Sequence, residues 1–351
     1  MKKIILLIFV LLITSGIEAH SKLLCAYFKD STWIVVNYDG EIIEPEIKIK
    51  SIGGYSEGFL RIKTEEDKWV FLDDDGNLAI EPDADLVRDF NSGLACVIKK
   101  DSLGQSWYGF IDTTGKLVIP HKFTYSNDFS EEIAYATAPD MRGYIMKDGN
   151  WYLELKKLVG YDFSEGISAV STESYEVGFI NISGEMIIKP QYLEPHQFKY
   201  GLCPVVKKAK FGYIDTTNTY IIPELYDDAR EFYEGLAIVG NFDNNHNVKY
   251  GVIDTTGKTI LPLMFDMMQN YSEGYSAVKI GDKYGFAGRT ILEFPKPLYF
   301  HCENYVDGMA WASIRDGEPK RGFINRAGEF IIELPEADAY MDLRLNKRVF
   351  N

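Results

Sequence analysis

Two short phrases recur along this chain at one interval, and this repetition constrains the fold more than any other feature. The first phrase is an aromatic residue, glycine, an apolar residue, isoleucine and an acidic or amide residue, as in residues 108–112. Degenerate copies begin at Trp33 and Trp69, so about nine units fill the chain. In proteins of this kind, each unit buries its apolar faces against its neighbours. The glycine of the phrase returns every 34 to 39 residues, at Gly109, Gly143, Gly178, Gly212, Gly251, Gly285 and Gly322.

A second phrase keeps the same interval. It consists of an aromatic residue, a small or polar residue, an acidic residue and glycine, followed by apolar residues, as in residues 163–170. Looser versions end at Gly93 and Gly201, and Glu132 takes the place of the glycine in one copy. Two independent phrases with one spacing establish the repeat. Their glycines fit a close backbone approach or a positive φ angle at a tight turn.

Each repeat unit predicts a small antiparallel sheet. In one copy, residues 236–239 and 249–254 are rich in apolar residues, a Thr-Thr-Gly turn follows at 255–257, and residues 258–261 form a third run. Short strands bounded by glycine, asparagine and aspartate are typical of hairpins, and the return loop has room for a fourth short strand. Because proline cannot donate a hydrogen bond to a sheet, we expect prolines to end the third strand. These prolines are Pro120, Pro190, Pro223 and Pro262.

Apolar residues lie on both faces of each predicted sheet. A sheet with one face in water alternates apolar and polar residues, whereas runs such as Leu-Val-Ile at 117–119 do not. We therefore expect an all-β array of about nine three-stranded antiparallel meanders over residues 20–340, each covered by its neighbours in propeller-like stacking. Residues 341–351 would follow as a C-terminal tail. An open superhelix is the alternative, because the first units are degenerate, as caps would be, and no strand visibly crosses between the ends.

The two phrases together, at 108–120 and 163–170, resemble the WG-containing repeat family, which includes the KWG repeats. The resemblance covers about residues 25–335. Most copies here carry Tyr, Phe or Arg in place of the tryptophan of the Trp-Gly pair, and the first two copies lack the glycine. The resemblance implies a bacterial, often exported repeat protein with interaction roles, and it supplies no catalytic residues.

The N-terminus has the layout of a secretory signal peptide. Lys2 and Lys3 precede an uninterrupted apolar stretch at 4–13, and a short polar segment leads to Ala19. We expect residues 1–19 to be removed and the protein to be exported to the periplasm, the cell surface or the medium. The apolar stretch is too short for a lasting anchor, and no later segment approaches eighteen apolar residues, so we expect no membrane span after cleavage.

The four cysteines lie in units that are not neighbours in sequence. We expect isolated buried thiols, although a pair between Cys25 and Cys302 is an alternative if the array closes, because their units would then meet. The cysteines are Cys25, Cys96, Cys203 and Cys302.

The formal charge of −15 argues against nucleic acid and acidic membranes as partners, because both are anionic. No histidine or cysteine spacing matches a zinc site, and no glycine loop could cradle phosphate, so we expect no metal and no cofactor. The acidic segment 73–77 resembles part of a calcium loop but lacks the later ligands, and its place in the repeat indicates a hairpin turn.

The sequence also predicts no catalytic site. Residues 54–58 match the pattern G-x-S-x-G, but Ser56 occupies a repeat position that Ser130, Ser164 and Ser272 fill in other units. A nucleophile elbow requires a strand, a sharp turn and a helix, and no helix is expected here. We therefore predict that the protein is not an enzyme.

The longest repeat steps place extra residues between the first two strands of the meander, at 100–106 and 241–247. Insertions at the same place in different units project from one edge of the array, and loops on a rigid scaffold often bind partners. We therefore expect an exported scaffold that binds a protein or a cell-envelope component, with these loops and the loop 316–319 as the first candidates for its binding site. The alternative explanation of the insertions is unselected loop drift. A carbohydrate-binding module with exposed aromatic residues is the other function considered. The candidate binding residues are Ser106, Asn241, Asp243, Asn245, His246 and Asp316.

Overall fold

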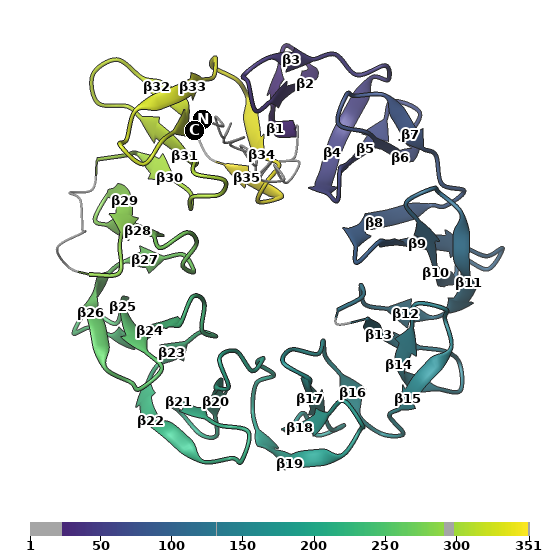
Figure 1. Cartoon of the computed structure of the whole chain (residues 1–351), viewed down its shortest axis with the longest axis vertical. Helices are drawn as coiled ribbons and strands as arrows, with labels where there is room; N and C mark the ends of the chain where they lie inside the picture. The colour runs from purple at the N-terminus through teal and green to yellow at the C-terminus, as the bar shows by residue number, and fades with distance from the viewer. Residues whose placement is uncertain (1–22, 131, 291–297, 350–351) are drawn as a thin grey trace, which may run out of the picture.

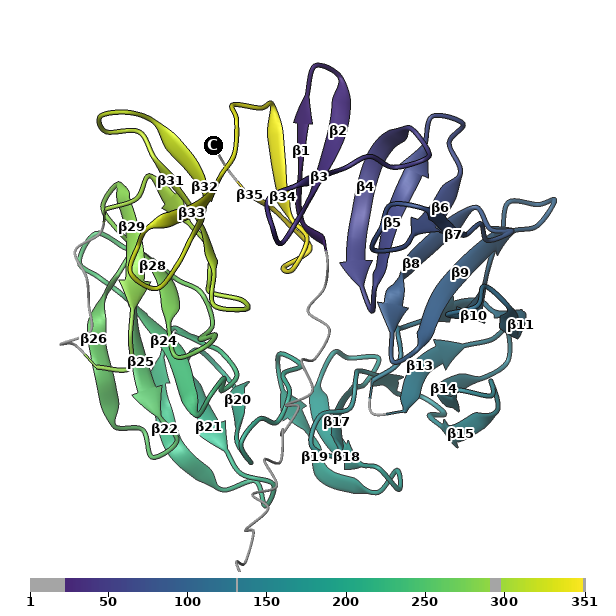
Figure 2. The same cartoon turned by 45° about the horizontal axis from the view of Figure 1, so that its top comes forward.

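A computed structural model describes residues 23–130, 132–290 and 298–349, which form nine small antiparallel sheets placed as blades around a ring (Figures 1 and 2). Within these ranges the secondary structure is entirely β, and the described chain contains no helix long and apolar enough to cross a membrane. Eight sheets are each built from one continuous stretch of chain, and the ninth joins strands from both ends, so the all-β prediction is confirmed. The predicted signal peptide, residues 1–19, lies outside the described residues.

A complete blade has four strands, from the centre of the ring to its rim, and each position recurs around the ring. The first strands are β4 (Ile49–Ser56), β8 (Leu86–Asn91), β12 (Tyr125–Ser126), β16 (Val159–Gly160), β23 (Asp228–Ala229), β27 (Met267–Met268) and β30 (His301–Cys302). The second strands are β5 (Phe59–Thr64), β9 (Leu94–Lys100), β13 (Ile133–Thr137), β17 (Ile167–Ser171), β20 (Cys203–Val206), β24 (Leu236–Phe242), β28 (Ser276–Ile280) and β31 (Ala310–Ile314). The third strands are β6 (Trp69–Leu72), β10 (Ser106–Asp112), β14 (Arg142–Met146), β18 (Val177–Asn181), β21 (Phe211–Ile214), β25 (Val248–Asp254), β29 (Lys283–Ala287) and β32 (Lys320–Ile324). The outer strands are β7 (Leu78–Ile80), β11 (Leu117–Phe123), β15 (Trp151–Glu154), β19 (Met186–Tyr192), β22 (Tyr220–Tyr226), β26 (Thr259–Phe265) and β33 (Phe330–Glu333).

The remaining sheet, blade 1, joins the two ends of the chain. Its order is β3 (Ile42–Ile43), β2 (Thr32–Asn37), β1 (Leu23–Lys29), β34 (Ala339–Asp342) and β35 (Lys347–Val349). Blades 2 to 9 follow in chain order from β4 to β33.

The pairing of β1 with β34 corrects the expectation that no strand crosses between the ends. Cys25 lies opposite Asp342 and Phe28 opposite Ala339, so a C-terminal strand supplies the inner strand that the first unit lacks. The segment 341–351, expected as a tail, belongs to this sheet as far as it is described. The ring is therefore closed, and the open superhelix is excluded (Figure 1).

Neighbouring blades bury the apolar residues of both sheet faces, as the repeat pattern predicts. Along β9, Leu94 and Cys96 pack in a cluster with Phe129 of blade 4. The intervening Ala95 and Val97 pack in a different cluster, which includes Phe71 of blade 2. Because successive side chains of a strand point to opposite faces, one blade fills two inter-blade cores.

The prolines do not end the outer strands, and this prediction was wrong. In blade 3, Tyr108 lies opposite Phe123 and Phe110 lies opposite Ile119, so β11 bulges between these two pairs and continues past Pro120. An outer strand tolerates proline because its outward edge needs no partner. The bulge crosses Gly109 so closely that an added Cβ would lie 2.6 Å from the Ile119 carbonyl oxygen. The glycine of the first phrase is therefore required by close backbone approach.

All four cysteines are free and buried, which confirms the prediction of isolated thiols. Cys25 belongs to the core between blades 9 and 1, whereas Cys302 belongs to the core between blades 8 and 9. Burial raises the pKa of Cys96 to about 12, so this thiol stays protonated and unreactive at neutral pH.

Candidate functional site

The second phrase forms the tight hairpin between the first and second strands of a blade. In blade 5, the backbone amide of Ser164 donates to the carbonyl of Ile167 over 2.9 Å, and the reverse bond is 3.1 Å. The two residues of the turn, Glu165 and Gly166, have φ angles of +54° and +71°. Two positive φ angles characterise the type I′ turn that matches the twist of a hairpin, so glycine is favoured at the second place.

The serine and glutamate of this phrase bind the next hairpin rather than their own. Ser164 Oγ donates to the Phe198 carbonyl over 2.8 Å. The Glu165 carboxylate accepts from the amides of Tyr200 and Gly201 over 2.7 and 2.9 Å. The same contacts recur in other units. The carbonyl oxygen of the aromatic residue in the next phrase accepts from Ser56, Ser130 and Ser272. The backbone amide of the glycine in a following phrase donates to Glu57, Glu234 and Glu273.

Polar residues just before the aromatic of each phrase form a second set of contacts between blades. Arg88 lies 3.4 Å from Asp128 of the next blade, measured from Nη1 to Oδ1, and also donates to the Ser126 carbonyl. Asn127 Nδ2 donates to Asp162 Oδ1 over 2.7 Å. Farther round the ring, His196 Nδ1 lies 3.0 Å from Glu231 Oε1. Consecutive blades are thus joined by polar pairs near the centre of the ring.

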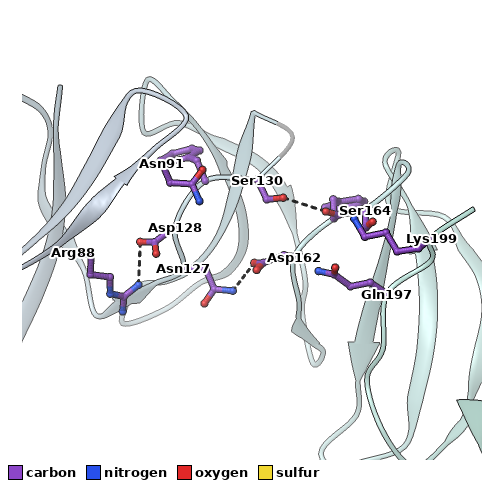
Figure 3. Close-up of a pocket in the computed structure, with 11 residues that line it drawn as sticks. Arg88, Asn91, Asn127, Asp128, Ser130, Asp162, Ser164, Gln197 and Lys199 are labelled. Carbon is purple, nitrogen blue, oxygen red and sulfur yellow. Dashed lines mark hydrogen bonds and ion pairs between the residues drawn. The ribbon is translucent and has the colours of Figure 1, made fainter. Parts of the chain in front are cut away.

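A groove of about 510 Å³ follows these residues across blades 3 to 6 (Figure 3). Asn127 already donates to Asp162, but the side chains of Gln197 and Lys199 make no hydrogen bond or ion pair with another described residue. The groove therefore offers an amide, an ammonium group and carboxylates to a ligand. It is lined by Arg88, Asn91, Asn127, Asp128, Phe129, Ser130, Asp162, Phe163, Ser164, Gln197 and Lys199.

Burial and neighbouring charges shape the electrostatics of the groove. Burial raises the pKa of Asp128, the Arg88 guanidinium opposes this shift, and the carboxylates of Asp89 and Asp162 reinforce it. A cationic group placed in the groove would relieve the repulsion between these carboxylates.

His196, next to Gln197 in the chain, is held between the carboxylates of Glu194 and Glu231. Burial opposes the charged imidazolium, but Glu231 and Glu194 outweigh it, so the pKa of His196 is raised. Burial likewise acts against the Glu231 carboxylate, while the hydrogen bond from His196 lowers the pKa of Glu231 on balance. The pair therefore favours the doubly charged state.

The six residues expected from the loops do not converge on this groove. They lie in or directly beside the turns between the second and third strands of blades 3, 7 and 9, at the opposite end of the second strand from the hairpins that line the groove. Ser106 pairs with Lys100 across the β9–β10 hairpin, and Asp316 forms an ion pair with Lys283.

The polar side chains of the inserted segment in blade 7 accept hydrogen bonds from backbone amides of the same blade. Asn241 Oδ1 accepts from the Asp227 amide over 2.9 Å, and Asp243 Oδ1 accepts from Asn245 and Asn247 over 2.8 and 2.9 Å. His246 sits in the same turn with a φ angle of +63°. A binding role for these loops stays a prediction.

Two other sequence interpretations are resolved by local contacts. Asp73 Oδ1 accepts from the amides of Asp75 and Asn77, each over 2.9 Å, so the acidic segment is a hairpin turn as predicted. Ser56 Oγ donates to the Phe90 carbonyl over 2.7 Å, which is a structural role. Over the described ranges, no three histidine, cysteine or acidic side chains gather where they could hold a metal ion.

Sequence reasoning missed the groove because its residues occupy ordinary repeat positions. The available signal was the two positions before each aromatic, which vary in identity but stay polar in most units, as in Arg88-Asp89 and Asn127-Asp128. Only the blade-to-blade geometry shows that these positions face one another.

The closed ring of nine antiparallel blades defines the protein as a β-propeller (Figure 1). Five segments match the family model of the WG containing repeat, and the chain belongs to this repeat family. The matched segments are 71–101, 108–137, 178–211, 211–241 and 250–284.

One of the similar solved structures supports the fold, and it supports the fold alone. A crystal structure described as the eukaryotic initiation factor is 13% identical, with a TM-score of 0.61 over 94% of this chain and 97% of that chain. A computationally designed protein, Ika8, is 11% identical with a TM-score of 0.41, covering 88% of this chain and 98% of its own. BamB from Moraxella catarrhalis is 10% identical with a TM-score of 0.43, covering 87% and 92%. No curated protein matches the sequence.

Proposed function

We propose that the protein is an exported, non-enzymatic scaffold that binds a partner protein of the cell envelope or the exterior through the groove across blades 3 to 6. The observation that carries the proposal is the set of polar groups in this groove whose bonding capacity the fold does not use. Gln197 and Lys199 are the clearest of these, and Asp162 accepts from Asn127 while retaining further lone pairs. Buried or half-buried polar groups gain most when a ligand completes their hydrogen bonds.

The groove suits a polypeptide better than the other polymers considered. It offers both signs of charge and side-chain amides over four consecutive blades, which can pair with backbone groups and with side chains of either sign. The net charge of −15 disfavours nucleic acid and anionic lipid. Protein partners with basic segments are the best electrostatic match for a chain of this charge.

The non-enzymatic part of the proposal is supported by how the recurring hydroxyl and carboxylate groups are used. Ser164 and Glu165 each bind the backbone of the next hairpin, and their counterparts in other blades do the same. These groups stabilise the ring, which is the role expected of a binding platform.

Export is supported by the basic and apolar N-terminal residues alone. N-terminal sequencing of the protein recovered from its native cells tests this part directly. We expect a mature chain that lacks residues 1–19 or a segment a few residues longer or shorter. A protein that retains Met1 in the cytoplasm would contradict export.

Site-specific photocrosslinking tests the groove. We would place a photoreactive amino acid at Lys199 and, as a matched control, at Lys189, which is exposed on the outer strand of blade 5. A partner protein should crosslink at position 199 and not at 189. The purified partner should then bind the chain in solution. The double variant Gln197→Ala, Lys199→Glu should bind the partner with an affinity at least about tenfold lower.

The charge reversal Lys189→Glu is the control for that affinity measurement, and it should leave binding unchanged. The proposal fails if crosslinks at the two positions recover the same proteins, or if the groove variant binds the partner as tightly as the original chain.

A further inference from the structure

A second hollow lies in blade 3, beneath the inserted loop between β9 and β10 and away from the hairpins that line the groove. Its volume is about 370 Å³, and Lys99, Lys100, Asp101, Trp107 and His121 line it. These residues come from β9, β10 and β11, which are the second, third and outer strands of the blade, and from the turn between β9 and β10.

Trp107 departs from the repeat at the position that precedes the aromatic-glycine pair. Five other units have lysine there, and each of these lysines forms an ion pair with a carboxylate. The pairs are Lys68–Glu81, Lys210–Asp227, Lys249–Asp266, Lys283–Asp316 and Lys320–Glu333. Blade 3 thus replaces a charged surface position with an aromatic ring, in a unit that also carries the longer loop.

The inserted loop fixes the orientation of this ring. Asp101 Oδ2 accepts from Trp107 Nε1 over 3.0 Å, while Asp101 Oδ1 accepts from the amides of Leu103 and Gln105 over 2.9 and 3.0 Å. The one polar atom of the indole is therefore bonded within the loop. What remains to contact a ligand is the carbon surface of a ring whose position is already set, which lowers the entropic cost of binding.

The charged groups around the indole ring differ in whether they have an ion-pair partner. Lys99 forms an ion pair with Asp83, and Asp101 is engaged in the turn. The Lys100 ammonium has no ion pair with another described residue, although its backbone amide donates to Asp85 over 2.7 Å. Lys100 thus places an ammonium group without an ion pair beside an aromatic surface, while the Asp101 carboxylate keeps its charge and is held by bonds from neutral N–H groups.

We infer that this hollow binds an acidic saccharide, with a pyranose ring packed on Trp107 and its carboxylate paired with Lys100. A pyranose presents a face of C–H groups, which carry partial positive charge and are attracted by the negative face of an aromatic ring. Its hydroxyl and carboxylate groups lie at the edge, where an ammonium donor can reach them. An apolar floor with a few placed polar groups is the common composition of small-ligand sites.

This inference is independent of the proposed protein-binding groove, since it involves another face of the ring and another class of ligand. It gives a specific location to the carbohydrate-binding function considered from the aromatic content of the sequence.

Titration calorimetry with trisaccharides of galacturonic, glucuronic and mannuronic acid tests the inference, with the neutral hexose trisaccharides beside them. At least one acidic trisaccharide should bind saturably to the full chain. Its neutral counterpart should have an affinity at least about tenfold lower. The variant Trp107→Lys introduces the residue that five other units carry, so it should fold normally and lose at least about tenfold in affinity. Lys100→Gln should weaken only the acidic ligand.

Tyr175→Ala is the matched control. Tyr175 is 82% exposed in the turn between β17 and β18, the equivalent turn of blade 5, and it does not line the hollow at Trp107. The control should bind like the original chain. The inference is overturned if no acidic trisaccharide binds, if Trp107→Lys binds as tightly as the original chain, or if neutral and acidic sugars bind equally. Capture of a partner at Lys199 is unaffected by any of these outcomes, so the two proposals fail separately.

Discussion

Arg344 and Asp342 form a buried ion pair at the closure of the ring. Arg344 Nε and Nη2 lie 3.0 and 2.7 Å from the two carboxylate oxygens of Asp342, and the side chains are 1% and 0% exposed. Arg344 Nη1 also donates to the carbonyls of Val306 and Met309 in blade 9, over 2.5 and 3.1 Å. One side chain therefore links the C-terminal hairpin of blade 1 to the adjacent blade.

Loss of this arginine should destabilise the closed ring strongly. Arg344→Met leaves the Asp342 carboxylate buried without its partner, for which we expect a loss of about 3–5 kcal/mol in the free energy of unfolding. Urea denaturation followed by circular dichroism measures this loss. The double variant Arg344→Met, Asp342→Leu should recover most of it, because no charge is then left unpaired. A single variant as stable as the original chain would show that the pair does not hold the closure.

At Gly109, the glycine of the first phrase should be needed for space rather than for a positive φ angle. In Gly109→Ala, the new methyl group would meet the Ile119 carbonyl oxygen at 2.6 Å, so we expect a loss of about 1–3 kcal/mol or more. Gly93→Asn is the control, because nothing lies within 4 Å of its Cβ position and asparagine tolerates a φ angle of +81°. Its cost should stay below about 1 kcal/mol. Equal losses in thermal or urea unfolding would refute this distinction.

The serine of the second phrase should matter more to stability than the glutamate. Ser164→Ala removes the buried bond to the Phe198 carbonyl, and we expect a loss of about 1–3 kcal/mol. Glu165→Gln retains an acceptor in an exposed turn, so its effect should be below about 1 kcal/mol. Urea midpoints of the two variants compare them directly, and the reverse order would contradict the proposed role of the serine.

The His196–Glu231 pair should make stability depend on pH near neutrality. The folded-state pKa of His196 is raised above its ordinary value of 6.5, so the stabilisation is fully present below pH 6.5 and is lost as the pH rises through the raised pKa. His196→Gln should therefore lose stability at pH 6 relative to the original chain and little at pH 8.5. Proton NMR titration of His196 measures the pKa directly. A pKa at or below 6.5 would contradict this account.

Much of the fold follows from local sequence. The interval between glycines predicts the number of units. The Asp-Thr-Thr-Gly and Ser-Glu-Gly segments predict turns, which the positive φ angles of Gly257 and Gly166 confirm. The bulge at Pro120 was not predicted. A proline that ends a strand and a proline past which an outer strand continues cannot be distinguished from a single sequence. The groove was not predicted either, since Asn127 and Asp162 are 35 residues apart and meet only when two blades stack.

The repeat, the antiparallel meander and the need for each sheet to be covered on both faces follow from the amino-acid sequence, because side-chain alternation and turn chemistry act over a few residues. The tertiary structure alone decided that the ring closes and that β34 completes blade 1, since closure depends on small rotations between blades that sum around the ring. It also decided which polar residues line one groove and left Trp107 over a hollow, because these placements depend on how whole blades pack.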